Sequence, residues 1–506
     1  MKGEERDAVV DIKAARVCQV DRKQTLLRVV DVERLIPDDH SARAIWEILG
    51  RLDLSRFYSE IKAVEGVAGR PAYDPRMMCC IWLYAYSEGE GLGREISRLC
   101  SHDPAYQWIT AFQEINHHSL SDFRMAHKEA LDELFTQVLG VLSSEGLIEL
   151  KRVSHDGTKI KSYAGADTFR REDTLKKHLR IAEEQVKKLS EQLTEDIKEK
   201  QSGAGKRCDR GRKQRLEFAL KELEKVRAKK KSVNEKEEAR VSTTEPEARI
   251  MKQPGGGYAP SYNAQISTDM TEGIIVGVRL SNEGADYREL IESANKIEKT
   301  MGKPPDEMVV DGGCMSRENI IEMGEKGINL IGSFQEKRKI TAGQMARRGI
   351  APGFNPSKFS YDSFRDSFTC PAGKVMDLKG KECKWPGLTN YIYRAKASDC
   401  FGCQFKDRCC PQSKKLGRGI VRGVNHPLVE AFIKRMETEE AKQIYKQRGR
   451  WSEFSNCWIK EKFGLRKFCL RGMGKALIEL LWACIAYNIK QWIRLRWQKR
   501  RLEALA

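Results

Sequence analysis

The sequence predicts a mixed α/β protein with an all-helical region at its N-terminal end. Between residues 40 and 146, apolar residues recur at three- and four-residue spacing, which is typical of helices. Between residues 258 and 333, short runs rich in β-branched residues alternate with helical patterns, which indicates a sheet with helical cover. A length of 506 residues suggests about three domains.

The composition favours a nucleic-acid partner. Lys and Arg number 91 against 72 Asp and Glu, giving a formal net charge of +19 that suits a polyanion. Proteins that bind RNA or anionic lipid share such a charge, so composition alone does not single out DNA. No apolar stretch of signal-peptide length opens the chain. The longest apolar run, residues 476–489, is shorter than the roughly 20 residues of a membrane span, and we predict a buried helix there. We therefore expect a cytoplasmic, nucleoid-associated protein with no membrane contact.

Residues 1–146 form the predicted helical N-terminal domain. Asp74-Pro75 and Ser121 are expected to begin helices, and Gly146 is expected to end the last one. Several cations could line a DNA-facing helix, although solvated helix faces carry such charges in any case. They are Arg70, Arg76, Arg94, Arg98, Arg124 and Lys128.

Residues 147–337 form the first part of the predicted core. Residues 148–153 alternate apolar and polar side chains and are predicted as a strand that ends in a turn at 154–157. Further strands are predicted at 262–268, 273–280, 307–310 and 329–333, with helices at 286–301 and from Ser316 onward. This order of strand, hairpin, helix, strand, helix and strand is that of a mixed sheet, as in ribonuclease H-like domains.

Two insertions interrupt this core. Residues 170–245 are highly charged with helical apolar spacing, and Ser202 to Gly205 form a candidate hinge between two helices. This segment is either a solvent-exposed helical hairpin or coiled coil, or a DNA clamp or dimer contact. Residues 338–427 lose regular periodicity and carry most of the clustered cysteines. Residues 428–506 are helical again and complete the core.

Two aspartates are candidates for metal-dependent phosphodiester chemistry. Such chemistry is served by two magnesium ions about 4 Å apart, held by carboxylates from separate elements. Asp156 and Asp311 are each predicted at or near a strand end, and each is followed by a glycine that lets the chain turn away. Asp-Gly is also a common turn dipeptide, so the local pattern alone leaves an ordinary turn open.

Longer motifs around these aspartates resemble those of a known family. They are Asp156-Gly157-Thr158-Lys159-Ile160, Tyr258-Ala259-Pro260-Ser261-Tyr262-Asn263-Ala264-Gln265 and Val309-Val310-Asp311-Gly312-Gly313. The series resembles consecutive landmarks of bacterial insertion-sequence DDE transposases of the IS1182 type, within the IS4/IS5 group. The resemblance spans nearly the whole chain, including Gly69-Arg70-Pro71 and Asp74-Pro75 ahead of an apolar helix.

A C-terminal signature carries the resemblance further. Tyr445, Arg448, Glu453 and Lys460 resemble the family's Tyr, Arg, Glu and Lys on the helix that supplies the third acid. Glu453 and Lys460 are about two helical turns apart on one face. The spacing from Arg448 to Glu453 is one residue longer than is usual in the wider group, which leaves Arg450 as a substitute. The stretches 463–468, with Arg466, 471–472 and 486–488 also match.

The resemblance implies the chemistry. Asp156, Asp311 and Glu453 would hold two Mg²⁺ or Mn²⁺ ions, with Asp156 bridging both. The DNA contacts would come from Tyr445, Arg448 or Arg450, Lys460 and Arg466, with Arg124 as a further candidate; for the signature residues, the ordinary alternative is a charged helix face.

The expected enzyme is a transposase that cleaves at terminal inverted repeats and joins the freed 3′ hydroxyl to target DNA, at least as a homodimer. The alternatives are a non-catalytic, transposase-derived DNA-binding or regulatory protein and a stand-alone metal-dependent nuclease.

The cysteines of the second insertion predict a structural zinc site. Cys400 and Cys403 form a CxxC pair, with Cys409 and Cys410 following and Cys370 and Cys383 upstream. Four thiolates close a tetrahedral shell around Zn²⁺, and Cys370, Cys400, Cys403 and Cys409 are the favoured set. The resemblance implies a zinc-ribbon-like element here. The alternative is a loop with reduced, unliganded cysteines.

Overall fold

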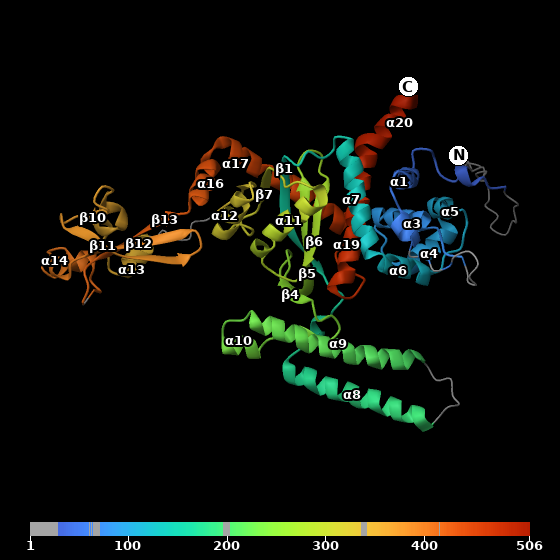
Figure 1. Ribbon diagram of the computed structural model, residues 1–506, viewed down its shortest axis with the longest axis horizontal. Coiled ribbons are helices and arrows are strands. Elements are labelled where there is room, and N and C mark those ends of the chain that lie inside the picture. Colours follow the sequence, from blue (N-terminus) through green and yellow to red (C-terminus); the bar gives the residue numbers. More distant parts are fainter. Residues whose placement is uncertain are drawn as a thin grey trace, which may run out of the picture.

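A computed structural model describes residues 29–505, apart from 60, 62, 64–70, 196–202, 335–341 and 414. The molecule is elongated, with a mixed sheet near its middle (Figure 1). The N-terminal helices lie on one side of this sheet, a second sheet lies at the far end, and a long helical hairpin projects below. The site residues therefore belong to elements that meet at the central sheet.

The N-terminal region is helical, as predicted. Its helices are α1 (Ser41–Gly50), α2 (Ser55–Ser59), α3 (Pro75–Ser87), α4 (Gly93–His102), α5 (Pro104–Thr110), α6 (His117–Ala126) and α7 (Lys128–Ser144). Asp74 caps α3 by accepting a hydrogen bond from the Arg76 amide, so that predicted start is confirmed. The predicted start at Ser121 is wrong. Ser121 lies inside α6, where its hydroxyl donates to the His117 carbonyl, and Asn116 supplies the cap.

The central sheet contains antiparallel and parallel strands. Its members are β1 (Arg152–Lys161), β4 (Arg249–Lys252), β5 (Tyr258–Asp269), β6 (Ile275–Ser281), β7 (Glu307–Val310) and β8 (Asn329–Ile331). Strand β5 is antiparallel to β1, and both β4 and β6 pair with the other edge of β5. On the opposite side of β1, β7 and then β8 follow in parallel. The predicted strands at 262–268, 273–280 and 307–310 and the mixed pairing are confirmed, and β8 is shorter than the predicted 329–333. The strand predicted at 148–153 lies instead at Arg152–Lys161.

The first core strand differs from the prediction. Residues 154–157 do not form a turn, because β1 pairs continuously with β5 from Val153↔Asp269 to Lys161↔Ser261. Asp156 and Gly157 therefore lie in the middle of an extended strand. Pairing with a segment about a hundred residues downstream has overridden the local tendency of Asp-Gly to turn.

Helices cover the sheet and connect it to the N-terminal region. Helices α11 (Leu290–Met301) and α12 (Arg317–Glu325) follow the predicted positions, with Ser316 as the cap of α12. Helix α19 (Met473–Trp492) is the buried helix predicted from its apolar run. Its Asn488 side chain accepts from the Ile275 amide at 2.9 Å and donates to the Ile275 carbonyl at 2.8 Å. One hydrophobic core joins the N-terminal helices, the sheet and α19.

The charged insertion forms the expected helical hairpin. Helices α8 (Glu172–Glu195) and α9 (Gly203–Ala228) pack through an apolar seam that contains Leu175, Ala182 and Leu216. The predicted hinge began at Ser202, which lies outside the described residues. Gly203 to Gly205 belong to α9 and are not part of a hinge.

The cysteine-bearing segment has more structure than the sequence indicated. It forms a five-stranded antiparallel sheet in sequential order: β9 (Ser360–Asp362), β10 (Ser367–Thr369), β11 (Val375–Trp385), β12 (Leu388–Ala395) and β13 (Gly419–Asn425). A separate small core includes Phe368, Met376 and Tyr393. The chain then returns to the central sheet through α16 (Pro427–Glu437), α17 (Glu439–Lys446) and α18 (Arg448–Cys457).

Of the described helices, none is both long and apolar enough to cross a membrane.

Candidate functional site

The register of two parallel strands brings Asp156 and Asp311 together. Strands β1 and β7 pair Ser154 with Val309 and His155 with Val310. The next position on each chain is the aspartate. Residues in register on neighbouring parallel strands project to the same face of a sheet. The two carboxyl groups therefore lie side by side, although a long stretch of sequence separates them.

Asp311 follows the last residue of β7, as predicted. Its Oδ1 accepts a hydrogen bond from the Cys314 amide at 3.0 Å, which fixes the carboxylate at the start of the turn. A Cβ on Gly313 would lie 3.1 Å from this oxygen, which is tighter than an ordinary contact. The second glycine of the Asp-Gly-Gly motif thus leaves room for the carboxylate.

Asp156 is held in a partly buried position without a paired cation. Its Oδ2 accepts from the Asn456 side-chain amide at 3.2 Å. The pKa of Asp156 is raised to about 6, chiefly by burial; the Arg448 charge opposes this rise, and the neighbouring charges of Asp311 and Asp286 add to it. Among the described residues, no salt bridge involves Asp156 or Asp311. Two adjacent carboxylates without a paired cation fit a divalent metal ion.

Asn456 adds a second indication of a ligand. Its carbonyl oxygen Oδ1 is buried and has no hydrogen-bond partner among the described residues. A buried polar atom without a partner is costly, so an ion or its water shell beside Asp156 would satisfy it. Asn456 was not among the site residues predicted from the sequence. The available signal was its position three residues after Glu453, which places both residues on neighbouring faces of one helix.

The glycine after Asp156 serves a purpose that differs from the predicted one. Gly157 points away from Asp156, and a Cβ there would overlap the Asp286 carboxylate on the opposite face of the sheet. Asp286 accepts from Lys159 at 2.9 Å, Asn263 at 2.6 Å and Gln265 at 2.9 Å. Burial raises the pKa of Asp286, but these hydrogen bonds and the Lys159 charge outweigh burial and lower it overall. Sequence reasoning missed this supporting network, although three of its members lie in the quoted motifs.

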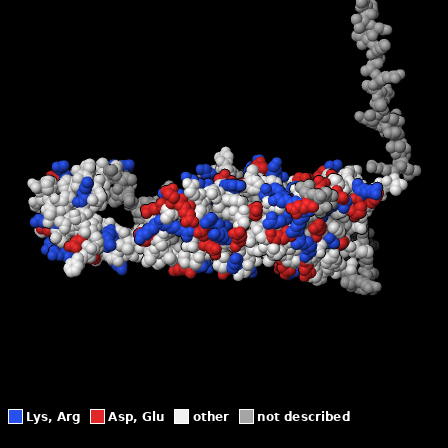
Figure 2. Space-filling view, turned by 90° about the horizontal axis from the view of Figure 1, so that it is seen from above, with Lys and Arg blue, Asp and Glu red and all other residues white. Residues whose placement is uncertain are grey.

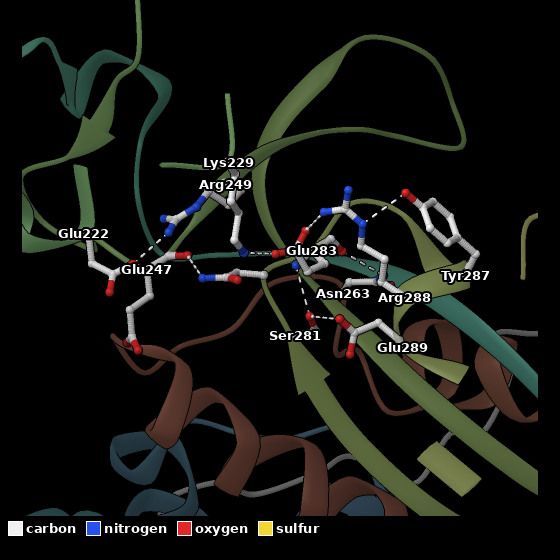
Figure 3. Close-up of polar contacts among 11 residues, drawn as sticks. Glu222, Lys229, Glu247, Arg249, Asn263, Ser281, Glu283, Tyr287, Arg288 and Glu289 are labelled. Carbon is white, nitrogen blue, oxygen red and sulfur yellow. Dashed lines mark hydrogen bonds and ion pairs between the residues drawn. The ribbon is translucent and has the colours of Figure 1, made fainter. Parts of the chain in front are cut away.

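The same network continues to the helical hairpin (Figure 3). The Asn263 side chain also donates to the Glu283 carbonyl at 3.0 Å. The Glu283 carboxylate pairs with Lys229, just beyond the end of α9, and with Arg288 at 3.4 Å. The short segment after β6 therefore anchors the base of the hairpin and presents Asp286 to the underside of β1.

Glu453 lies on the helix that approaches Asp156 but does not contact it. The side chain is exposed, and a Cβ on Gly449 would lie 3.1 Å from its Oε1. The buried face of α18 instead presents Ser455, which bonds Thr268 at 3.0 Å, and Asn456. Across the described chain, no three His, Cys, Asp or Glu side chains converge on one metal position. The structure thus brings Asp156 and Asp311 together and leaves Glu453 about one helical turn from Asn456.

Among the predicted DNA-contact residues of the signature, Arg448 and Lys460 interact with Asp156, whereas Arg450 packs on a tryptophan ring. The pKa of Lys460 is lowered by burial, against the opposing charge of Asp156, and Arg466 adds to the lowering. Arg448 is close enough to lower the pKa of Asp156, so it borders the carboxylate pair. Tyr445 packs against a small apolar cluster that contains Val309, Ile331 and Ile444. By contrast, Arg450 is exposed, and its guanidinium lies 5.3 Å from the centre of the Trp451 ring. Of the two arginines, Arg448 is therefore the one that we assign to the carboxylate pair.

Arg124 is not available for DNA, and its prediction is wrong. It is only 5% exposed and donates to the Tyr86 hydroxyl at 3.2 Å and the Gly91 carbonyl at 2.7 Å. Its guanidinium lies 4.5 Å from the centre of the Trp82 ring. The side chain therefore stabilises the N-terminal helices from within.

The clustered cysteines line one small cavity at the edge of the second sheet. The cavity is bordered by Cys370, Cys400, Cys403, Cys409 and Cys410. The Arg418 amide donates to Cys400 Sγ at 3.2 Å, and the Phe405 amide donates to Cys403 Sγ at 3.4 Å. Amide donors of this kind stabilise thiolates, which are the form that binds zinc. Cys383 is exposed on β11 and does not border the cavity.

Replacing Asp156 by Asn should stabilise the metal-free fold at alkaline pH. The pKa of Asp156 is raised in the folded chain, so ionisation costs stability as pH rises through about 4 to 6. At pH 8 in EDTA, Asp156→Asn should gain about 1 kcal/mol after allowance for solvent screening, or about 1 to 2 °C in Tm. At pH 4, where the folded carboxyl is largely protonated, most of the difference should disappear. Thermal unfolding at both pH values measures the difference in Tm between the variant and the unaltered protein. An unchanged Tm at pH 8 would contradict the stability cost that we assign to ionised Asp156.

Two protein-family models match the chain. The Transposase DDE domain matches residues 369–493, and the Transposase domain (DUF772) matches residues 30–126. The first match contains the clustered cysteines and Glu453, and the second contains α1 to α6. Asp156 and Asp311 precede the first match. No curated protein matches the chain.

Both matching models describe transposase domains, so two segments of the chain are similar to transposases. The pair of domains is typical of IS1182-family transposases, so the resemblance seen in the sequence motifs is confirmed.

Proposed function

We propose that the protein is a DNA transposase that cleaves at the ends of its element and joins them to target DNA by transesterification. The observation that carries the proposal is the β1–β7 register, which places Asp156 beside Asp311 without a paired cation. The order β6-β5-β1-β7-β8, with β7 and β8 parallel to β1, supports a ribonuclease H-like core. In such a core, carboxylates from the central strands serve one metal-dependent site.

The carboxylates fit magnesium or manganese, which bind oxygen ligands and keep open positions for water and phosphate. When bound, two such ions would activate the attacking hydroxyl and stabilise the leaving oxygen. Asp156 would contribute a ligand to both ions, and Asp311 would contribute a ligand to one of them. Glu453 would supply a ligand to the other ion if its side chain rotated toward Asn456. Asn456 orients Asp156 through its amide.

Neighbouring cations would position the DNA. The charges of Arg448 and Lys460 both interact with Asp156. The two side chains would hold the phosphate group that reacts, Arg448 by a bidentate contact and Lys460 as a point charge. Tyr445 would contact the adjoining backbone from beside β7. We also propose that 147–337 and 428–506 together make the catalytic core, that 1–146 packs on it through a shared hydrophobic core, and that 338–427 is an inserted unit with a small core of its own. Two copies of the chain would bring two ends together.

The test uses purified full-length protein with DNA that carries the inverted repeats flanking its coding region. With Mg²⁺ or Mn²⁺, the expected products are ends with free 3′ hydroxyls and molecules joined to target DNA. Binding without cleavage would overturn the proposal in favour of a regulatory DNA-binding protein. Cleavage without joined products would overturn it in favour of a nuclease.

We propose in addition that Cys370, Cys400, Cys403 and Cys409 hold a structural zinc ion. Their common cavity and the two amide-to-sulfur hydrogen bonds support this assignment. Side-chain rotations would be needed to close the four thiolates around one ion. A closed shell of this kind stabilises the fold and leaves no position for substrate. Cys410 borders the same cavity and is the competing fourth ligand.

Metal analysis of chelator-washed protein should find about one zinc per chain, as expected for a single four-thiolate site. Cys400→Ser/Cys403→Ser should lose the ion and lower the thermal stability of the second sheet. Cys383→Ser/Cys457→Ser, which replaces two exposed cysteines, is the control and should keep both. Comparison of Cys409→Ser with Cys410→Ser identifies the fourth ligand. Zinc below about half an equivalent in the unaltered protein would count against a stoichiometric site.

A further inference from the structure

The end of β1 meets a loop that carries several cations. Lys161, the last residue of β1, pairs with Lys467 in an isolated parallel bridge. The Lys161 amide donates to the Arg466 carbonyl at 3.1 Å, and the Phe468 amide donates to the Lys161 carbonyl at 2.9 Å. These bonds bring residues 161–163 and 466–471 side by side. We call the surface formed by Lys161, Tyr163, Arg466, Lys467 and Arg471 the Tyr163 surface.

An exposed aromatic ring organises this surface. Tyr163 is 43% exposed, yet two cations lie over its ring. The Arg471 guanidinium is 4.3 Å from the ring centre, and the Lys467 ammonium is 5.4 Å from it. Cation–π contacts of this geometry favour a fixed position for otherwise flexible side chains. The ring therefore holds two positive charges close together at the surface.

The charge of the Tyr163 surface is largely uncompensated. Arg466 pairs with Glu461, and its side chain remains 69% exposed. Lys161, Lys467 and Arg471 are exposed and form no salt bridge with any described residue. The ordinary explanation is a solvated cationic loop. However, like charges held together by one ring repel each other, and a polyanion relieves that repulsion.

The position of the surface relates it to the proposed active site. Lys161 is five residues beyond Asp156 on the same strand, which at about 3.3 Å per residue is about 17 Å. Asp311 marks the same carboxyl end of the parallel strands. The charge of Lys460 interacts with both Asp156 and Arg466. The Tyr163 surface therefore follows the carboxylate pair along β1, and Lys460 is coupled by charge to both.

We propose that the Tyr163 surface binds the DNA phosphate backbone about five base pairs from the bond that is cleaved. Duplex DNA advances about 3.4 Å per base pair, so about 17 Å corresponds to about five steps. Lys467 and Arg471 contact the phosphates, and the Tyr163 ring holds both cations in place for them. The inference rests on the proposed function, because it assigns a substrate-binding region to that same active site.

Binding of a fluorescein-labelled 30-base-pair duplex, measured by anisotropy at several salt concentrations, tests the contact. Each phosphate contact adds about 0.9 to the slope of log affinity against log salt, so Lys467→Ala/Arg471→Ala should reduce the slope by about two. The control is Lys299→Ala/Lys303→Ala, which removes two exposed lysines near the opposite end of the sheet. The control should keep the original slope. An unchanged slope for the Lys467/Arg471 variant would overturn the proposal.

Two further experiments test the role of the Tyr163 ring and the distance of the contact from the cleaved bond. Tyr163→Phe keeps the π face and should bind as the unaltered protein does, whereas Tyr163→Ala should weaken binding several-fold. Neutral methylphosphonates about five base pairs from the cleaved bond should weaken binding, and those about fifteen base pairs away should not. Equal effects at both positions would overturn the placement. Asp156→Asn should retain the full salt slope, so loss of chemistry and loss of this contact can be told apart.

Discussion

Asp156→Asn and Asp311→Asn should each reduce DNA cleavage by at least about a thousandfold, a loss of about 4 kcal/mol of transition-state stabilisation. Each change removes a charge from the adjacent pair while keeping the size of the side chain. A neutral amide is a poor ligand for a hard divalent ion, so both the attacking and the leaving oxygen would lose their stabilisation. DNA binding should remain within about twofold to threefold, because the cations around the pair are unchanged.

The matched control is Asp306→Asn, which removes an exposed carboxylate just before the opposite end of β7. This variant should cleave at the normal rate. Cleavage is followed on labelled DNA ends, and binding is followed by anisotropy on the same DNA. Normal cleavage by either Asp156→Asn or Asp311→Asn would remove that residue from the proposed site.

Glu453→Gln should also abolish cleavage, although Glu453 does not contact Asp156 in the structure. Its place on α18, about one turn from Asn456, lets the side chain rotate toward the pair when an ion draws it in. Asn456→Ala should have a smaller effect of about tenfold, because Asn456 orients Asp156 and does not replace a ligand charge.

Glu440→Gln serves as the control for Glu453, since Glu440 is an exposed carboxylate on the preceding helix α17. It should leave cleavage unchanged. If Glu453→Gln cleaves normally while Asn456→Ala does not, the third position of the site belongs to Asn456 and the assignment of Glu453 is wrong.

The succession of strands and helices along the core was accessible from the sequence, but the place of the first aspartate within its strand was not. Short β-branched runs such as that ending at Val310 predicted β7 correctly, because their pattern is local. Asp156-Gly157 was predicted as a turn from the same kind of local evidence. Its extended conformation depends on β5, and no local pattern reports a partner so far along the chain.

Two further errors have similar physical causes. The five-stranded sheet around Tyr393 was missed because its strands are short or strongly polar, and most of their side chains are at least partly exposed. Arg124 was predicted on the surface because arginine is rarely buried. Its burial depends on Trp82 and on acceptors at Tyr86 and Gly91, which only the packing of the helices brings together. On the face drawn in Figure 2, basic and acidic side chains are interspersed over the surface.

Asn456 and Asp286 contribute to the candidate site but were not predicted from the sequence motifs. Both lie outside the motif residues that were given roles, yet one bonds Asp156 and the other supports Gly157 from the opposite face. Their roles follow from geometry that couples a strand to a helix and to a short segment far away in sequence.

The most direct test of the central claim, that Asp156 binds the catalytic ions, is a change of metal preference in Asp156→Cys. Thiolates bind softer ions, so this variant should be inactive with Mg²⁺ and should recover cleavage by at least about tenfold with Mn²⁺. The unaltered protein should be active with both. Full cleavage by Asp156→Cys with Mg²⁺, or the same residual rate with the two ions, would contradict direct coordination by Asp156.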